Sequence, residues 1–242
     1  MKISFVIPAN NEEAYIRRCL DAIFAGIRAS SIDAEVIVVN NASTDSTRVI
    51  VEKYPHVIIV DEGRKGLSYA RQAGFAASTG DIIANVDADN IITQDWIGKV
   101  LKEFTKNKKL VALSGPVVFY DLAWYFNIQV RIFYILAYIV YVVNHFVLRT
   151  SGMLQGGNFV LRKSALDKIG GYDTNFSFYG EDADIARRMQ KIGYVKFTFG
   201  LPILSSGRRL AREGILNAGA KYAINYLWVV MLKRPFHKEQ VE

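Results

Sequence analysis

Short runs of β-branched and other apolar residues alternate with helical patterns through the first third of the chain. The runs are residues 3–7, 35–39, 57–60 and 81–86. Between the first two runs, apolar side chains recur at helical spacing: Ile16, Leu20, Ile23, Phe24 and Ile27. Strands that alternate with helices indicate βαβ units on a mainly parallel sheet. We therefore expect an α/β fold with a twisted sheet flanked by helices.

Polar residues mark the predicted helix starts. Asn10 with Glu13 matches a capping box before the first helix, and Thr93 is predicted as the N-cap of a later helix. That helix leads to a strand-like run over residues 110–120. After it, Gly156-Gly157-Asn158 precedes another short strand, and a polar helix is expected at residues 181–191.

The character of the chain changes after residue 121. Residues 122–148 are dominated by apolar and aromatic side chains and predict an apolar helical insertion. Residues 211–242 predict a C-terminal amphipathic helix and tail. We expect one domain over residues 1–210, with a first half of about 1–115 and a second half of about 116–210 that includes the apolar insertion.

The charge balance limits the classes of partner. The 242 residues carry a formal net charge of +7, with a pI near 9.4, which suits a diphosphate, an anionic membrane surface or nucleic acid. No RNA-binding motif or zinc-finger spacing is visible, so we expect no nucleic acid. The single cysteine, Cys19, has no partner for an internal disulfide, and no apolar leader precedes the first strand. Both features favour a cytoplasmic protein.

Polar residues follow three of the predicted strands, in residues 8–12, 40–45 and 86–90. Because carboxyl ends of parallel strands meet at one edge of a sheet, these segments are expected to line one crevice. Asp87 and Asp89 are two residues apart, so both carboxylates can project to one side and share Mg²⁺ or Mn²⁺. A diphosphate would complete the coordination shell. The alternative is a turn whose side chains cap its own backbone.

Several motifs in this order resemble glycosyltransferase family 2, whose inverting enzymes have the GT-A nucleotide-sugar fold. The resemblance rests on residues 7–12, 38–45, 65–74, 79–89, 156–158 and 180–182. It implies that the first half binds the nucleotide sugar and the second half binds the acceptor. The implied nucleotide-sugar residues are Pro8, Ala9, Asn10, Glu12, Asn40, Asn41, Ser43, Asp45, Gly66, Arg71, Asp87, Ala88 and Asp89.

The chain departs from the family pattern at Asn40 and Asn41, where the family usually carries an acidic residue. An amide both donates and accepts hydrogen bonds, which leaves the identity of the base open. A turn that tolerates left-handed geometry is the alternative for this pair. Arg71 could meet a carboxylate or phosphate, or be a solvated helical arginine.

The resemblance also implies the residues that act on the acceptor. Asp182 is expected to take the proton from the acceptor hydroxyl, with Glu181 as a positioning residue. From the local pattern alone, this pair could merely complement a helix dipole. An acceptor or diphosphate site is expected at Gly156, Gly157, Asn158, Arg208 and Arg209. The alternatives are a strand-entry turn for the glycines and a basic surface turn for the arginines.

These features predict transfer of a sugar from a UDP- or GDP-sugar to a hydroxyl or lipid-phosphate acceptor. Two alternatives remain. One is a sugar nucleotidyltransferase, although residues 8–12 lack the Gly-rich, basic phosphate loop expected of that class. The other is a non-catalytic nucleotide-sugar binding module, which would have no use for the Asp182 base.

A peripheral position at the inner face of the cell membrane is also expected, through residues 122–148 and 222–232. In the first segment, one narrow polar stripe is formed by Asn127, Arg131, Tyr134, Tyr138, Tyr141 and His145. Its apolar run, 132–143, is shorter than the roughly 20 residues that span a bilayer. In the second segment, aromatic anchors and flanking cations are Tyr222, Tyr226, Trp228, Lys233 and Arg234. The alternatives are core helices or a homodimer contact.

Overall fold

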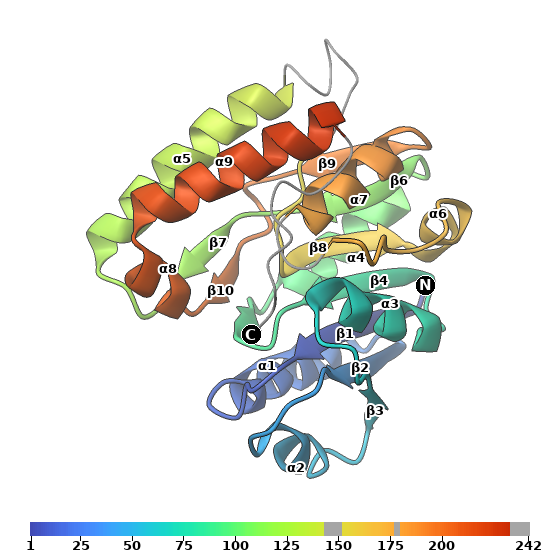
Figure 1. Ribbon diagram of the computed structural model, residues 1–242. Helices are drawn as coiled ribbons and strands as arrows, with labels where there is room; N and C mark the ends of the chain where they lie inside the picture. The colour runs from blue at the N-terminus through green and yellow to red at the C-terminus, as the bar shows by residue number, and fades with distance from the viewer. Residues whose placement is uncertain (143–151, 177–179, 233–242) are drawn as a thin grey trace.

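A seven-stranded sheet forms the centre of the computed structural model, which describes residues 1–142, 152–176 and 180–232 (Figure 1). Its strand order is β3 (Val57–Asp61), β2 (Ala34–Asn40), β1 (Ile3–Ala9), β4 (Ile82–Val86), β8 (Asn158–Arg162), β6 (Leu110–Ser114) and β9 (Tyr194–Phe197). Only β8 runs antiparallel to its neighbours in this sheet. The expected α/β fold with a mainly parallel sheet is confirmed.

Two hydrophobic clusters cover opposite faces of this sheet. One face packs on α1 (Ile16–Ser30) and α4 (Trp96–Lys106). The other face packs on α3 (Leu67–Ala77), α6 (Lys163–Lys168) and α7 (Glu181–Gln190). Successive side chains of a strand point to opposite faces, and so the apolar run of β1 serves both clusters.

A second sheet of three strands lies beside the first, with β5 (Asn90–Ile92), β10 (Ile203–Ser205) and β7 (Val117–Phe119) in that order. The strand predicted over residues 110–120 is therefore wrong as a single strand. It divides into β6 and β7, which lie in different sheets. Gly115 stands at the division, where a Cβ atom would overlap the carbonyl group of Leu201. Pro116 follows and has no N–H to donate to a ladder.

Both predicted helix caps are wrong. The first helix begins at Ile16, after Tyr15, and has no side-chain cap. Asn10 donates instead to the carbonyl of Asn41, and Glu13 accepts the N–H of Ser46. The helix after Thr93 begins at Trp96, following Asp95, and the Thr93 hydroxyl bonds the Asp95 carboxylate. The side chains that the capping pattern assigned to helix ends are thus hydrogen-bonded to other residues.

The remaining helices are α2 (Thr47–Val51), α5 (Trp124–Val142), α8 (Arg208–Glu213) and α9 (Ile215–Leu232). In Figure 1, α5 and α9 run side by side on the outside of the smaller sheet, and Phe133 of α5 lies close to Gly219 of α9. The apolar helical insertion and the C-terminal helical segment are both present. The predicted parts at residues 143–148 and 233–242, including His145, Lys233 and Arg234, lie outside the described residues.

Candidate functional site

Hydrogen bonds between side chains and backbone join the two loops that follow β1 and β2. Asn10 Nδ2 donates to the carbonyl oxygen of Asn41 at 2.7 Å. Asn11, which has a left-handed φ of 55°, accepts the N–H of Thr44 at 2.8 Å through Oδ1. Ser43 Oγ accepts the N–H of Asn11 at 3.2 Å. The loops predicted to hold the nucleotide therefore form one connected surface at the carboxyl edge of the sheet.

The side chain of Asn41 is buried and committed to the neighbouring loop. Its Nδ2 donates to the carbonyl oxygens of Glu62 at 3.1 Å and Arg64 at 2.7 Å, while its Oδ1 accepts the N–H of Gly66 at 2.8 Å. These bonds fix the turn that begins α3. Asn41 therefore positions Gly66 and has no amide group left over, whereas its neighbour Asn40 donates once, to Asp61 at 2.8 Å.

Asp45 anchors the start of α2. Its Oδ1 accepts the Thr47 N–H at 2.9 Å, and its Oδ2 accepts the Glu13 N–H at 3.1 Å. Partial burial would raise the Asp45 pKa, but the hydrogen bonds from Thr47 outweigh it and hold the pKa below its ordinary value. Pro8 and Ala9 end β1 as buried residues. The structure thus gives these positions a part in shaping the loops.

Arg71 is the charged centre of the cleft. Its side chain is fully buried, with Nη1 donating to Glu181 and Nη2 donating to Asp87 Oδ1 at 3.0 Å. The guanidinium also lies over the Phe159 ring, 4.8 Å from its centroid. The alternative of a solvated helical arginine is wrong. One buried cation on α3 instead links the end of β4 to the start of α7.

Gly157 makes room for the Asp87 carboxylate. The glycine has a left-handed φ of 73°, and a Cβ atom there would overlap Asp87 Oδ2 and the Asn90 side chain. Asn90 Nδ2 donates to the Gly157 carbonyl at 2.8 Å and holds the turn in place. Only Gly157 of the pair needs the space that a missing Cβ leaves, and the group that approaches it is the Asp87 carboxylate.

Asp89 lies in a second charged cluster with Glu12 and Arg208. Arg208 Nη2 is 3.6 Å from Asp89 Oδ2 and also donates to Glu12 Oε1. The Arg208 guanidinium stacks on the Tyr15 ring at 4.4 Å. Burial and the nearby Asp87 carboxylate raise the Asp89 pKa to about 7, although Arg208 opposes the shift. The cluster is a place where an additional cation would be favourable.

The residues present fit a divalent metal ion. Asp87 and Asp89 supply carboxylate oxygens, which are the ligands that Mg²⁺ and Mn²⁺ prefer. Glu12 Oε2 is buried beside them with no hydrogen-bond partner. Within the part of the chain that the structure describes, no group of three or more metal-ligating side chains gathers. An ion held here would therefore need oxygens from a ligand as well.

A cavity of about 60 Å³ lies between Asp87 and the start of α7. Gly156, Glu181, Asp182 and Tyr222 also line it. Asp182 Oδ1 accepts the Ala183 N–H at 2.8 Å, and burial raises the Asp182 pKa above its ordinary value. A raised pKa makes the ionised carboxylate a better proton acceptor. The arrangement suits a base that faces a small polar substrate.

Asn158, Arg209 and Ala88 are among the predicted site residues that lie away from this cavity and from the charged cluster. The buried Asn158 amide accepts from Trp96 Nε1 at 3.1 Å and donates to the Leu201 carbonyl at 2.9 Å, which ties the two sheets together. The Arg209 Nε atom donates to Glu213 on its own helix at 2.8 Å. Ala88 is buried in the core below the cleft. The contacts of these three residues are with other parts of the protein.

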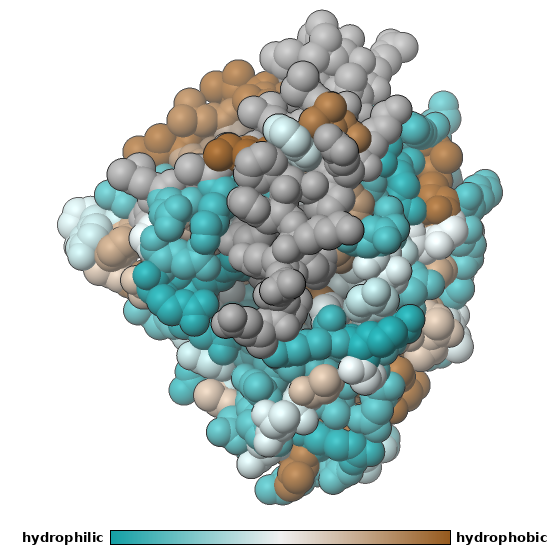
Figure 2. All heavy atoms as spheres, in the orientation of Figure 1, coloured by the Kyte–Doolittle hydropathy of each residue, from teal (hydrophilic) through white to brown (hydrophobic). Residues whose placement is uncertain are grey.

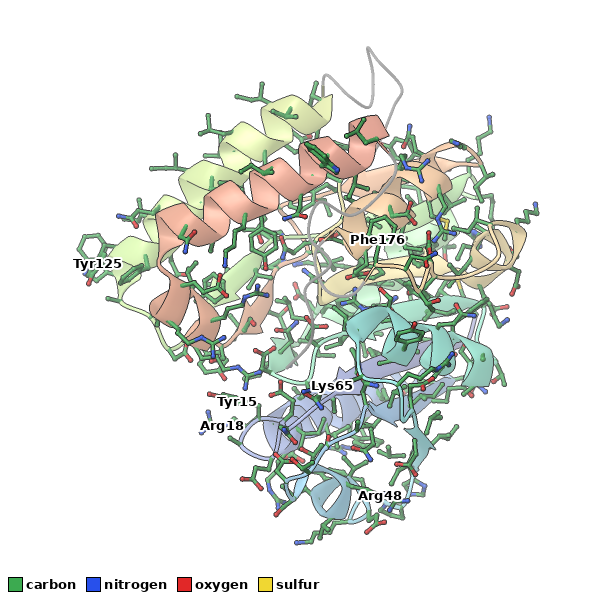
Figure 3. All side chains as sticks on the ribbon, in the orientation of Figure 1. Tyr15, Arg18, Arg48, Lys65, Tyr125 and Phe176 are labelled. Atoms are coloured by element: carbon green, nitrogen blue, oxygen red, sulfur yellow. The ribbon has the colours of Figure 1, made fainter. Side chains whose placement is uncertain are left out.

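Tyr15 and Gln155 are among the residues of the site that sequence reasoning missed. Tyr15 carries the Arg208 guanidinium on its ring, and Figure 3 labels it near the start of α1. Gln155 lines the small cavity and accepts from the Tyr134 hydroxyl at 2.7 Å. Its position directly before Gly156 was the signal that could have found it. For Tyr15 no signal exists, because its partner is almost two hundred positions away.

A glycosyltransferase of the GT-A fold is the class of protein that this sheet and its acidic cleft define. The profile of glycosyl transferase family 2 matches residues 4–170, and that of the N-terminal domain of galactosyltransferase matches residues 142–201. The chain belongs to glycosyl transferase family 2. The resemblance seen in the sequence is confirmed, and so is the expectation of a transferase.

Curated relatives carry the same class of activity in their names. The probable glycosyltransferase YdaM of Bacillus subtilis (strain 168) is 31% identical over 206 residues, which cover 80% of this chain and 47% of that protein. Chondroitin synthase of Pasteurella multocida (strain Pm70) is 32% identical over 115 residues, or 46% of this chain and 12% of that protein. The chain thus spans about half the length of the first relative and much less of the second.

Solved structures share the fold at low sequence identity. A mannosyltransferase from Pyrobaculum calidifontis, in complex with GDP-Man and Mn²⁺, is 19% identical, with a TM-score of 0.67 over 96% of this chain and 63% of that one. Glucosyl-3-phosphoglycerate synthase from Mycobacterium tuberculosis, with Mn²⁺, UDP-glucose and phosphoglyceric acid, is 18% identical. Its TM-score is 0.64, over 97% of this chain and 80% of that one.

Proposed function

We propose that the chain is a metal-dependent, inverting glycosyltransferase that uses a nucleoside diphosphate sugar. The observation that carries the proposal is the single small cavity lined by both Asp87 and Asp182. It puts a carboxylate of the metal pair and a candidate base on the wall of the same cavity. The Mn²⁺ and UDP-glucose or GDP-Man bound by the fold neighbours support the same donor class.

Each charged residue has a defined part in this proposal. Asp87 and Asp89 would hold the ion, which would neutralise negative charge on the diphosphate. Asp182 accepts the proton of the acceptor hydroxyl while the acceptor oxygen bonds to the anomeric carbon and the bond between that carbon and the diphosphate breaks. Attack from the face opposite the leaving group inverts that carbon. The buried Arg71 holds Asp87 and Glu181 in place through an ion pair with each.

A product assay tests the proposal against both alternatives. With a panel of UDP- and GDP-sugars, Mg²⁺ or Mn²⁺ and an acceptor mixture, the protein should release nucleoside diphosphate. A sugar nucleotidyltransferase would release pyrophosphate, and a binding module would bind without release. Excess chelator should stop the reaction, and added metal should restore it. Full activity in chelator would refute the metal-dependent mechanism.

We also propose a peripheral membrane position, which would suit a lipid-linked acceptor. Three polar side chains of α5 point inward: Asn127 bonds the backbone of Phe119, Tyr134 accepts the N–H of Val117, and Tyr141 donates to the carbonyl of Val195. Gln129 and Arg131 are exposed, but most of the outer face is apolar, with exposed fractions of 53% at Ile132, 58% at Leu136 and 56% at Ile139. Brown surface extends along this side of the molecule in Figure 2. A surface helix that faces water has the opposite arrangement, with its polar side outward and its apolar side against the protein.

The helix α5 could cross a membrane by length and composition, with 19 residues and a mean hydropathy of 1.4. Its inward bonds to the protein body, and α9 beside it, favour a position along the surface instead. Placed so, the catalytic domain would lie at the inner face of the cell membrane, in the cytoplasm. Tyr222 of α9 lines the small cavity, so an acceptor could arrive from the lipid side.

Sedimentation with anionic liposomes tests the membrane position. Wild-type protein should sediment with the vesicles and be released by alkaline carbonate, as a peripheral protein is. The double variant Leu136→Glu with Ile139→Glu should stay in solution, because charges on the outer face of α5 oppose insertion. Val49→Glu is a matched control on α2, where Val49 is exposed but distant from this face. A wild-type protein that stays in solution as a dimer would favour a homodimer contact instead.

A further inference from the structure

Arg208 already places a cation inside the acidic cleft. It contacts Glu12, lies 3.6 Å from Asp89 Oδ2 and stacks on Tyr15. Its side chain is 41% exposed, so it can be reached by an incoming ligand. The residue comes from α8, near the end of the described chain, whereas the carboxylates come from the loops after β1 and β4. The pair of aspartates at residues 87 and 89 does not by itself predict that an arginine from α8 contacts Asp89.

The charges of the cleft explain why Arg208 is there. Arg71 already neutralises one oxygen of Asp87 and pairs with Glu181. Glu12 and Asp89 are left to share the single guanidinium of Arg208, and Glu12 Oε2 remains buried without a partner. A divalent ion on Asp87 and Asp89 would stand beside this guanidinium. Because like charges a few ångströms apart repel each other, the ion and Arg208 compete for Asp89.

A diphosphate would end this competition. Its oxygens are strong acceptors for a guanidinium and can pair with it in a bidentate manner. The backbone before Arg208 is held fixed, since Asp121 accepts from Ser206 Oγ at 2.6 Å and from the Gly207 N–H at 2.5 Å. Only the Arg208 side chain has to move away from Asp89, and Glu12 stays within its reach.

We propose that Arg208 is an internal counter-ion that pairs with Asp89, beside the metal position, until the nucleotide binds. Resting on the metal site proposed above, this inference adds a rule for binding order: the divalent ion binds weakly alone and tightly together with the diphosphate. Before the nucleotide binds, Arg208 neutralises Asp89. After it binds, Arg208 pairs with the diphosphate. Arg71 pairs with Asp87 and Arg208 lies beside Asp89, so each carboxylate has a cation next to it.

Titration of the ligand-free protein with Mn²⁺ alone tests the inference. Free Mn²⁺ can be followed by electron paramagnetic resonance, without any turnover. Arg208→Gln should bind Mn²⁺ at least about tenfold more tightly than wild type, because the competing cation is gone. The same variant should bind UDP or GDP with Mn²⁺ more weakly than wild type, because the diphosphate loses its partner. Arg208→Lys should fall between the two proteins in both titrations.

Arg212→Gln is the matched control, since Arg212 is exposed on the same helix. It should match wild type in both titrations, and thermal melting should show that every variant is folded. If Arg208→Gln binds Mn²⁺ alone no better than wild type, the inference is overturned even when nucleotide still promotes metal binding. If neither protein binds Mn²⁺ with nucleotide present, the metal-dependent function itself fails, and the inference fails with it.

Discussion

The two halves of the cleft hold their polar residues in different ways. In the first half, the loops after β1 and β2 are bonded to each other and to the turn before α3, mostly through the amides of Asn10, Asn11 and Asn41. In the second half, Glu181 and Arg208 reach across to charges on the first half. Neutral local bonds therefore shape the loops that we propose to hold the donor, whereas ion pairs align the proposed acceptor side on them.

The shape of the loops in the first half and the alignment of the second half on them therefore depend on different interactions. The donor loops should keep their form whatever the second half does, because their bonds are made within residues 8–66. The acceptor side depends on charges that a buried arginine holds in place, and removing one partner of a buried pair is costly. Three substitutions test this division, and a fourth tests the acid response of the first half of the chain, in order of decreasing expected effect.

Asp182→Asn should leave the donor side intact while stopping transfer. An asparagine keeps the size of the side chain but cannot accept the proton of the acceptor, so kcat should fall about 100- to 10,000-fold. Calorimetry should find nucleotide affinity unchanged. The contrasting variant is Asp89→Asn, in which metal-dependent nucleotide affinity and kcat should fall together. Loss of nucleotide binding in Asp182→Asn would mean that the two sides are not separable.

Arg71→Met should lower the free energy of unfolding by about 3–5 kcal/mol, because Glu181 and Asp87 would lose a fully buried partner. Urea unfolding at pH 7 measures it. Arg64→Met is the control: Arg64 pairs with Glu62 at the surface, where its side chain is 67% exposed, so the loss should stay below about 1 kcal/mol. Equal losses in both variants would contradict the aligning role of Arg71.

Asn41→Ala should cost about 2 kcal/mol, because the Gly66 N–H and two carbonyls would lose their buried partner. Nucleotide affinity should fall as the loop before α3 loosens. Asn40→Ala, which removes one bond to the exposed Asp61, is expected to cost less than about 1 kcal/mol. Urea unfolding and calorimetry of both variants give the comparison. The reverse order would show that Asn40 is the residue that shapes the donor side.

Glu35→Gln should change how the first half responds to acid. Burial would raise the Glu35 pKa, but hydrogen bonds from Lys2, Ser4 and Thr79 lower it from 4.5 to about 2. Its contribution, on the order of 1–2 kcal/mol after solvent screening, is therefore present above pH 4.5 and lost as pH falls toward 2.

Urea unfolding of wild type and Glu35→Gln between pH 7 and pH 3 measures this contribution. The difference in unfolding free energy between the two proteins should be largest at pH 7 and should shrink below pH 4.5. Glu52→Gln is the control, since the side chain of Glu52 is 49% exposed. A constant difference across this range would contradict the assigned pKa.

The strands of the first half were predictable because their signal is local. The predicted runs at residues 3–7, 35–39 and 57–60 agree with β1, β2 and β3 to within two residues at each end. Runs of β-branched residues bounded by polar turns specify a buried strand by themselves. The direction of β8 was not predictable, because periodicity contains no information about strand orientation.

The site was predictable in its residue types but not in their contacts. The spacing of Asp87 and Asp89 indicated a paired carboxylate site, and the ordered motifs indicated Asp182. Burial of Arg71 and the Arg208 contact with Glu12 depend on partners far apart in sequence. The hydrogen bonds of the Asn41 amide were not predictable for the same reason, because its acceptors, the carbonyls of Glu62 and Arg64, lie in the loop after β3.

The antiparallel strand β8 has a consequence for how the chain folds during synthesis. It is paired between β4 and β6, and until it forms, β4 is the open edge of a four-stranded sheet made by β3, β2, β1 and β4. About 70 residues separate β4 from β8, so at 5–20 residues per second the ribosome exposes that edge for several seconds. An open edge recruits other strands. Nascent chains truncated between residues 90 and 150 should therefore aggregate more readily than chains that extend past Arg162.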